Sequence, residues 1–151
     1  MYNPHTVSLV IVSEGQNGTT EQAVTYLEGV FLDEHQGGAV NKAGITTNDN
    51  CTLYIPLSQV KAISADTHRA QQYVPAYEYS QKQSKTNFWT VFSGGKLSSQ
   101  DCFFVKGKIS PTNLLDYAAL RKAGASVFRV SSVTPRDYGI RINPYLEVGG
   151  Q

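Results

Sequence analysis

The sequence has few charged residues and no excess of either sign. Charged residues make up 17% of the 151 residues, against about a quarter in typical soluble domains. The 13 lysines and arginines nearly balance the 12 acidic residues, so the chain lacks the basic excess with which proteins neutralise nucleic-acid phosphates or anionic membranes. A polar surface with little charge is compatible with burial against protein neighbours, because charged residues are depleted at the centres of interfaces.

Long apolar runs and cysteines are also scarce. No segment approaches the ~20 consecutive apolar residues of a membrane span, and the N-terminus lacks the basic start and apolar run of a signal peptide. We therefore expect a protein made in a cytoplasm, with no membrane partner. Cys51 and Cys102 are the two cysteines, and in a reducing compartment two buried thiols are favoured over a disulfide. The length suits a single domain, 1–151.

Alternating apolar and polar residues predict a mainly β protein. Val7, Leu9 and Ile11 share one face of a strand over 5–13. Asn17-Gly18 favours a hairpin into an antiparallel second strand. The second and later strands are expected over 21–33, 51–57, 88–92, 101–106, 126–133 and 140–148. Short strands without βαβ alternation indicate a small antiparallel β-barrel with long loops.

One short helix is expected over about 111–123. Ser110 can cap its start, and Pro111 suits the first helical position. Gly124 suits the end, where a left-handed residue is often needed. We expect this helix to cover one side or end of the barrel.

The polar segment 34–50, between the second and third strands, is the candidate working part. It is too long for a two-residue hairpin, and its glycines and asparagines tolerate the positive backbone angles of turns. We expect a projecting, glycine-hinged loop. Its candidate residues are Gly37, Gly38, Asn41, Lys42, Gly44 and Asn48.

A second polar stretch, rich in Tyr and Gln, spans about 59–87. Residues 58–65 are compatible with a short helical turn, and 66–87 do not have the pattern of a core segment. Either this stretch packs on a partner, because tyrosine offers large contact area at low entropic cost, or it is a flexible surface insertion. The candidate contacts with another subunit or a partner are Tyr73, Tyr77, Tyr79, Arg136 and Tyr138.

No residue pattern indicates an enzyme or a cofactor. His5, His35 and His68 are far apart and lack the spacing of a metal site. The cluster Asp33-Glu34-His35 is better explained as a solvated loop entrance than as a metal site. Ser93-Gly94-Gly95-Lys96 lacks the spacing of a phosphate-binding loop. We therefore expect a non-enzymatic protein that binds no metal.

Several strand-associated segments together carry a resemblance that spans nearly the whole chain. These segments are Pro4–Val7, Gly29–Asp33, Asn41–Gly44, Cys51–Leu57, Phe88–Val91 and Phe128–Val133. Their order resembles the minor capsid or head–tail joining proteins of tailed bacteriophages. The resemblance implies a head-closure protein, or stopper, of the virion neck. The helix over 111–123 and the insertion over 59–87 depart from the pattern, so an adaptor or a tail terminator of the same connector remains an alternative.

What the resemblance implies about partners is also specific. Such proteins form a ring of six or twelve copies, with adaptor or portal proteins above and the tail terminator or tail tube below. The ring retains packaged DNA and docks the tail. In such a ring, loop 34–50 of each subunit would narrow the axial channel, and Lys42 would face the DNA end transiently.

The competing hypothesis is a carbohydrate-binding β-sandwich module. In that case Trp89 and the tyrosines would form an exposed stacking platform. Trp89 lies between Phe88 and Thr90 in an apolar strand, so we expect its side chain to be buried.

Overall fold

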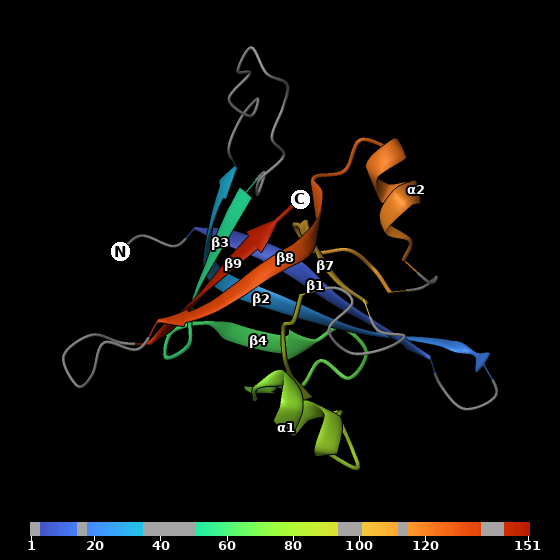
Figure 1. The fold of residues 1–151 in the computed structure, drawn as a ribbon, viewed down its shortest axis with the longest axis vertical. Helices are drawn as coiled ribbons and strands as arrows, with labels where there is room; N and C mark the ends of the chain where they lie inside the picture. The colour runs from blue at the N-terminus through green and yellow to red at the C-terminus, as the bar shows by residue number, and fades with distance from the viewer. Residues whose placement is uncertain (1–3, 15–17, 35–50, 94–100, 112–114, 137–143) are drawn as a thin grey trace.

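The strands and helices are defined in a computed structural model that describes residues 4–14, 18–34, 51–93, 101–111, 115–136 and 144–151 (Figure 1). Within these ranges most of the chain is β-structure, as the sequence predicts. The elements in chain order are β1 His5–Glu14, β2 Thr20–Glu34, β3 Cys51–Pro56, β4 Lys61–Ser64, β5 Gln72–Tyr73, α1 Ala76–Gln81, β6 Phe88–Trp89, β7 Asp101–Lys106, α2 Tyr117–Lys122, β8 Val127–Arg136 and β9 Tyr145–Gly150.

The main sheet closes on itself as a small antiparallel barrel. Its strands follow the order β1-β7-β8-β9-β3-β2, and β2 pairs with β1 as well, which completes the ring. The predicted antiparallel pairing of the first two strands is confirmed. One edge of β2 pairs with β4 over 25–28 and then with β3 over 31–34. Gly29, at φ +84°, lies between these two stretches, where a bend requires a backbone angle that other residues rarely adopt.

Alternating side chains fill the inside of this ring. Val7, Leu9 and Ile11 of β1 point inward, as predicted, and meet inward residues of the other strands. The largest fully buried members of this inner cluster are Trp89, Phe104, Leu9, Leu27, Leu53, Ile55 and Leu146. Cys51 and Cys102 are buried and form no disulfide, and burial raises the pKa of Cys102 to about 12. The two cysteines are therefore part of the packing, as expected.

A second apolar cluster lies on the outside of the barrel. Val10 of β1, Val24 of β2 and Phe103 of β7 point outward and are nevertheless buried. Residues Leu115, Tyr117 and Leu120, on and before α2, pack against them. The helix therefore covers one outer side of the barrel, over β1, β7 and the first residues of β8.

This helix is shorter than the predicted 111–123 and has a different cap. It begins at Tyr117, and the Asp116 carboxylate accepts a hydrogen bond from the Ala118 N–H at 3.3 Å. The predicted Ser110 cap is wrong, because an Asp nearer the apolar positions serves equally well as an N-cap. The predicted end is confirmed by Gly124, which has φ +90°.

Replacing the cap should weaken the attachment of α2. Asp116→Ala is expected to lower the free energy of unfolding by about 1 kcal/mol, because an N-terminal amide of the helix loses its acceptor. Urea unfolding followed by far-ultraviolet circular dichroism measures this change. Asp116→Asn, which keeps an acceptor, should retain most of the stability. Equal stability of Asp116→Ala and the wild type would contradict the assigned cap.

The stretch 59–87 differs most from its prediction. The expected helical turn over 58–65 is reduced to a single turn at 57–59, where the Val60 N–H donates to the Pro56 carbonyl at 2.8 Å. Lys61–Ser64 forms β4 instead and buries Ala62 against β2. The interpretation of 66–87 as non-core is wrong, since Val74 and Tyr79 belong to the inner cluster. The chain forms a second short helix here, α1, where one helix was expected. Four-residue strands and isolated apolar residues provide too little periodicity for a sequence pattern to detect.

The predicted strand over 88–92 is reduced to two residues. Phe88–Trp89 forms β6 and pairs in parallel with β5, as an exception to the antiparallel pairing elsewhere in the described chain. Trp89 is 1% exposed, as expected, and its ring lies 5.0 Å from that of Tyr73. At the other end of the chain, β8 continues to Arg136, beyond the predicted 133, and β9 begins at Tyr145.

Candidate functional site

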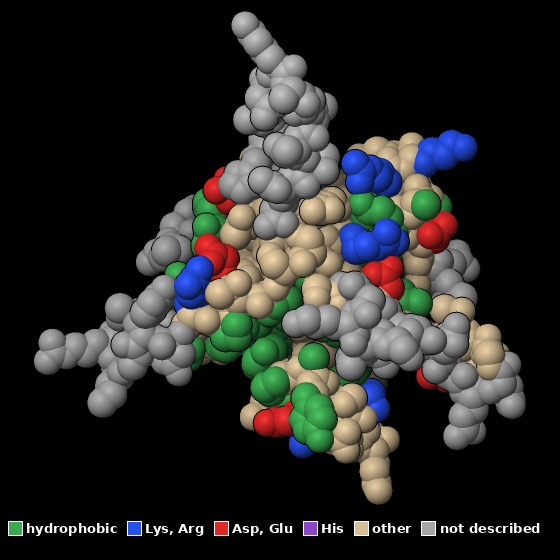
Figure 2. Space-filling model, viewed as in Figure 1, with side chains coloured by type: hydrophobic (Ala, Val, Ile, Leu, Met, Phe, Trp, Pro, Cys, Tyr) green, Lys and Arg blue, Asp and Glu red, His purple; other side chains and the backbone are tan. Residues whose placement is uncertain are grey.

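One outer face of the barrel, formed by β3, β9, residues 31–34 of β2 and residues 132–136 of β8, is covered by no described helix. Its outward residues alternate with the inward Leu32, Leu53, Leu146 and Val148. Register pairs place the outward residues in cross-strand rows, for example Phe31 beside Tyr54 and Tyr54 beside Glu147. We call this surface the open face. Its residues are Phe31, Asp33, Thr52, Tyr54, Ser132, Thr134, Arg136, Tyr145, Glu147 and Gly149. Part of it is visible in Figure 2 as mainly polar, tan-coloured surface over β9 and β8.

A row of aromatic rings crosses the open face. Ring centroids are separated by 5.6 Å from His5 to Phe31, by 6.1 Å from Phe31 to Tyr54, and by 6.2 Å from Tyr54 to Tyr145. His5 is fixed at one end, because its Nδ1 accepts a hydrogen bond from the Leu32 N–H at 2.9 Å. All four side chains are half-buried. The row therefore offers preorganised aromatic area to a partner, with little side-chain entropy left to lose.

The open face also has a shallow hollow and little charge. Gly149 has no side chain, and the hollow of about 290 Å³ around it is lined by Thr52, Ser132, Thr134 and Glu147. Arg136 donates from Nε and Nη2 to one oxygen of Glu147, at 3.1 and 2.9 Å. This ion pair is partly exposed, so it orients the two side chains more than it stabilises the fold. Tyrosine, arginine and small polar residues in this proportion are typical of binding surfaces.

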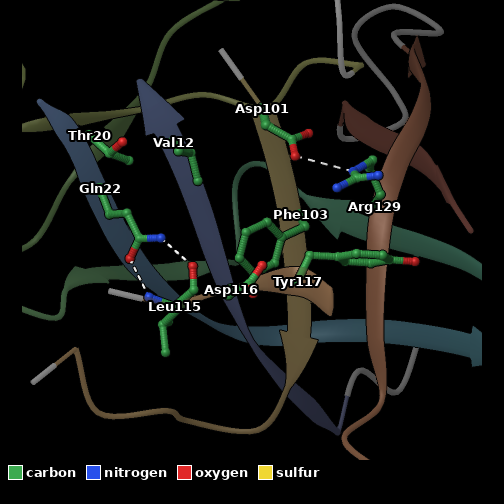
Figure 3. Close-up of a pocket in the computed structure, with 9 residues that line it drawn as sticks. All are labelled: Val12, Thr20, Gln22, Asp101, Phe103, Leu115, Asp116, Tyr117 and Arg129. Carbon is green, nitrogen blue, oxygen red and sulfur yellow. Dashed lines mark hydrogen bonds and ion pairs between the residues drawn. The ribbon is translucent and has the colours of Figure 1, made fainter. Parts of the chain in front are cut away.

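A second hollow, also of about 290 Å³, lies on the α2 side of the barrel (Figure 3). Phe103 and Val12 provide apolar walls. Gln22 bonds to the backbone of Leu115 in both directions, accepting from its N–H at 2.7 Å and donating to its carbonyl. These two bonds fix the segment before α2 on the barrel.

Two charged groups of this hollow, Asp101 and Arg129, are paired with one another. The Asp101 carboxylate accepts from the Cys102 N–H at 2.9 Å and from Arg129 Nε at 3.1 Å. The Arg129 guanidinium lies 4.4 Å from the centre of the Tyr117 ring, and the Tyr117 hydroxyl donates to the Gln151 carbonyl at 2.9 Å. This network joins α2 to β7, β8 and the last residue. These interactions attach the helix to the barrel.

The predicted loop residues lie outside the described part of the chain. They are Gly37, Gly38, Asn41, Lys42, Gly44 and Asn48, and Tyr138 of the second predicted group is also outside it. The structure does describe the two ends of the loop. Glu34 and Cys51 are a register pair of β2 and β3, so residues 35–50 leave and return at a single point of the barrel. Glu34 is also 3.5 Å from Lys106 Nζ.

The other predicted contacts are divided between the core and the surface. Tyr79 is 4% exposed and packs in the inner cluster, so its side chain faces the core. Tyr73 is half-buried, and burial raises the pKa of both phenols. Tyr77 is 75% exposed, and Arg136 lies on the open face. The tyrosines of 73–79 therefore do not form one surface with Arg136.

The open-face aromatics were missed by sequence reasoning, although a signal was present. In 51–57, Tyr54 is an outward position of a strand whose inward positions are all apolar. A single outward aromatic residue is ordinary, whereas several that lie side by side indicate an interaction surface. Which strands lie beside β3, and hence which aromatics join Tyr54, depends on the closed ring.

The described residues contain no group of three His, Cys, Asp or Glu side chains arranged to hold a metal ion. Nor does any helix in the described ranges have the length and apolarity to cross a membrane. The stacking platform proposed for a carbohydrate-binding module lacks its central residue, because Trp89 is buried.

These features define a small, mainly antiparallel β-barrel protein with one outer side covered by a helix and another side that no described helix covers. The family model DUF6751, described as a family of unknown function, matches residues 4–151. The chain belongs to this family. Neither the curated proteins nor the solved structures include a significant match.

Proposed function

We propose that this protein is a structural subunit of the head–tail connector of a tailed bacteriophage, of the head-closure or stopper type. In this role, copies of the chain form a ring in the virion neck, retain the packaged DNA and provide a docking surface for the tail. The proposal needs a rigid subunit, a segment that reaches the channel, and surfaces for neighbouring subunits.

The observation that carries the proposal is the anchoring of residues 35–50. The register pair Glu34–Cys51 ties both ends of this segment to one point of a closed barrel. A closed barrel has no free edge along its ring and resists deformation, so it is a firm base for a segment that must bear on a DNA end. The glycines at 37, 38 and 44 favour a change of conformation on opening.

The charge of this segment suits a reversible gate. Lys42 is its single lysine or arginine, and Glu34 and Asp49 carry opposite charge. Each phosphate contact that a protein makes adds to salt-dependent affinity. A ring in which each subunit makes few such contacts would block the DNA end without holding it tightly, as ejection requires.

Deleting residues 37–47 should separate gating from folding. We expect a variant that keeps the barrel and still joins heads, because the removed residues lie between paired strand ends. Heads completed with this variant should lose their DNA, measured as packaged DNA protected from nuclease. A matched variant that replaces 37–47 with a Gly/Ser segment of equal length separates the role of length from that of sequence. Normal DNA retention by the deletion variant would overturn the gating role.

The position of the protein in the connector is tested by which assembly intermediate it binds. A stopper binds to heads that already carry portal and adaptor, and it must bind before the tail does. An adaptor binds to portal alone, and a tail terminator binds to free tails. The native mass of the protein, alone and mixed with each partner, distinguishes these cases. A monomer that binds neither heads nor tails would exclude the connector proposal.

A further inference from the structure

The open face and the α2 side are different parts of the barrel surface. In the ring order β1-β7-β8-β9-β3-β2, the pair β1–β7 is separated from the pair β3–β9 by β8 on one side and β2 on the other. Helix α2 packs over β1, β7 and the first residues of β8, whereas the open face centres on β3 and β9. Two different surfaces on one chain are the requirement for a head-to-tail contact between identical subunits.

The outer surface of α2 is smooth and basic. Ala118, Ala119 and Ala123 are exposed, and such small side chains allow another surface to approach the helix closely. Lys122 is also exposed, and Arg121 Nη1 donates to the Tyr117 hydroxyl at 2.6 Å. Around α2 these two basic residues exceed the single acidic residue, Asp116. Figure 2 shows the basic side chains gathered at this edge of the molecule.

The open face has the complementary character. Its acidic residues, Asp33 and Glu147, exceed its single basic residue, Arg136. The hollow at Gly149 provides a depression beside the aromatic row. A short helix with alanines on its outer side fits such a depression, while the rims bring opposite charges together.

We propose that α2 of one copy docks on the open face of the next copy, with Lys122 near Asp33. This inference rests on the proposed ring and specifies its subunit contact. Because the two surfaces differ, each copy keeps one free α2 side and one free open face until the chain of contacts closes. We infer a second copy as the occupant because the α2 surface and the open face of this one chain are complementary in charge and in shape.

A bulky charged side chain at the centre of the open face provides the first test. Ser132→Arg places a long side chain beside the hollow and should weaken self-association by about tenfold or more, equivalent to about 1.4 kcal/mol. Ser84→Arg is the matched control, because Ser84 is exposed between α1 and β6, away from both surfaces. The mass distribution from analytical ultracentrifugation, measured over a range of concentrations, provides the readout. Equal association of the two variants would overturn the docking surface.

Charge reversal provides the second test. Lys122→Glu and Asp33→Lys should each weaken association, because like charges then face one another. Both changes in one chain should restore it, and so should mixing the two single variants. Recovery in the double variant is not expected from misfolding, which would worsen when two lesions are combined. Failure of the double variant to recover while both single variants remain folded would overturn the proposed pairing.

The same experiments separate this inference from the function on which it rests. If the wild type forms rings or binds heads and these substitutions have no effect, the docking geometry is wrong and the connector role stands. If the wild type neither self-associates, alone or on heads, nor binds heads or tails, both proposals fail. If it binds an immobilised glycan instead, the open-face aromatics serve a carbohydrate ligand and the docking proposal is overturned.

Discussion

Trp89→Ala is expected to lower the free energy of unfolding by about 3–5 kcal/mol, the range for removing a large buried aromatic side chain. Trp89 is 1% exposed, packs against Tyr73, and belongs to the cluster inside the barrel. The loss includes the transfer term and the cavity that remains, because the surrounding strands are held by their ladders and cannot collapse fully. A loss this large is a substantial fraction of the stability of a typical domain.

The measurement must not depend on tryptophan fluorescence, since Trp89 is the single tryptophan. Urea unfolding followed by circular dichroism provides the free energy, and the reactivity of the buried Cys51 and Cys102 thiols reports on barrel opening. Tyr77→Ala is the control, because Tyr77 is 75% exposed and should change stability by less than about 0.5 kcal/mol. Equal, small effects at the two positions would contradict the placement of Trp89 inside the barrel.

The neighbouring Thr90 should respond in the opposite direction. Its Oγ1 is buried, and no described residue supplies a hydrogen-bond partner. Thr90→Val keeps the shape and removes this unsatisfied hydroxyl, so we expect stability equal to the wild type or higher by about 1 kcal/mol. A large loss of stability for Trp89→Ala together with no loss for Thr90→Val would show that the effect depends on the packing of each side chain. It would not be explained by a general intolerance of substitutions in this segment.

Gly150→Ala should destabilise the barrel by about 1–3 kcal/mol, the usual cost of overpacking a core. A Cβ on this residue would lie 2.8 Å from Cys51 Sγ, 2.8 Å from Phe128 Cβ and 2.9 Å from Phe104 Cζ. Gly150 pairs with Cys51 of β3 and with Val130 of β8. The strand therefore cannot move away from the contacts without opening one of two ladders.

The control for Gly150→Ala is a substitution in the same sheet that adds no atom to the core. Ser132→Ala, on the exposed side of β8, should leave the free energy of unfolding within about 0.5 kcal/mol of the wild type. Gly150→Ala/Cys51→Ala should recover part of the loss, because one of the three close contacts is removed. An unchanged stability of Gly150→Ala would mean that β9 does not occupy this position.

The sequence by itself determined the β class, the first hairpin and the identity of most long strands. In β1 and β3, strict alternation over several residues is a local property, and it holds whichever strand becomes the neighbour. Burial of Trp89 and of both cysteines also followed from local apolar context. The end of α2 at Gly124 could also be predicted from the sequence, because the C-terminal end of a helix often requires one residue with a positive φ, which glycine adopts easily.

Only the tertiary structure decided which strands became neighbours and which outer side stayed open. Lys61–Ser64 becomes a strand because β2 offers it an unpaired edge, and Tyr79 is buried because the inner cluster accepts its ring. The row from His5 to Tyr145 joins residues that are far apart in the chain, and no local pattern contains it. Periodicity records which way a side chain points, but its neighbours are set by the order in which the ring closes.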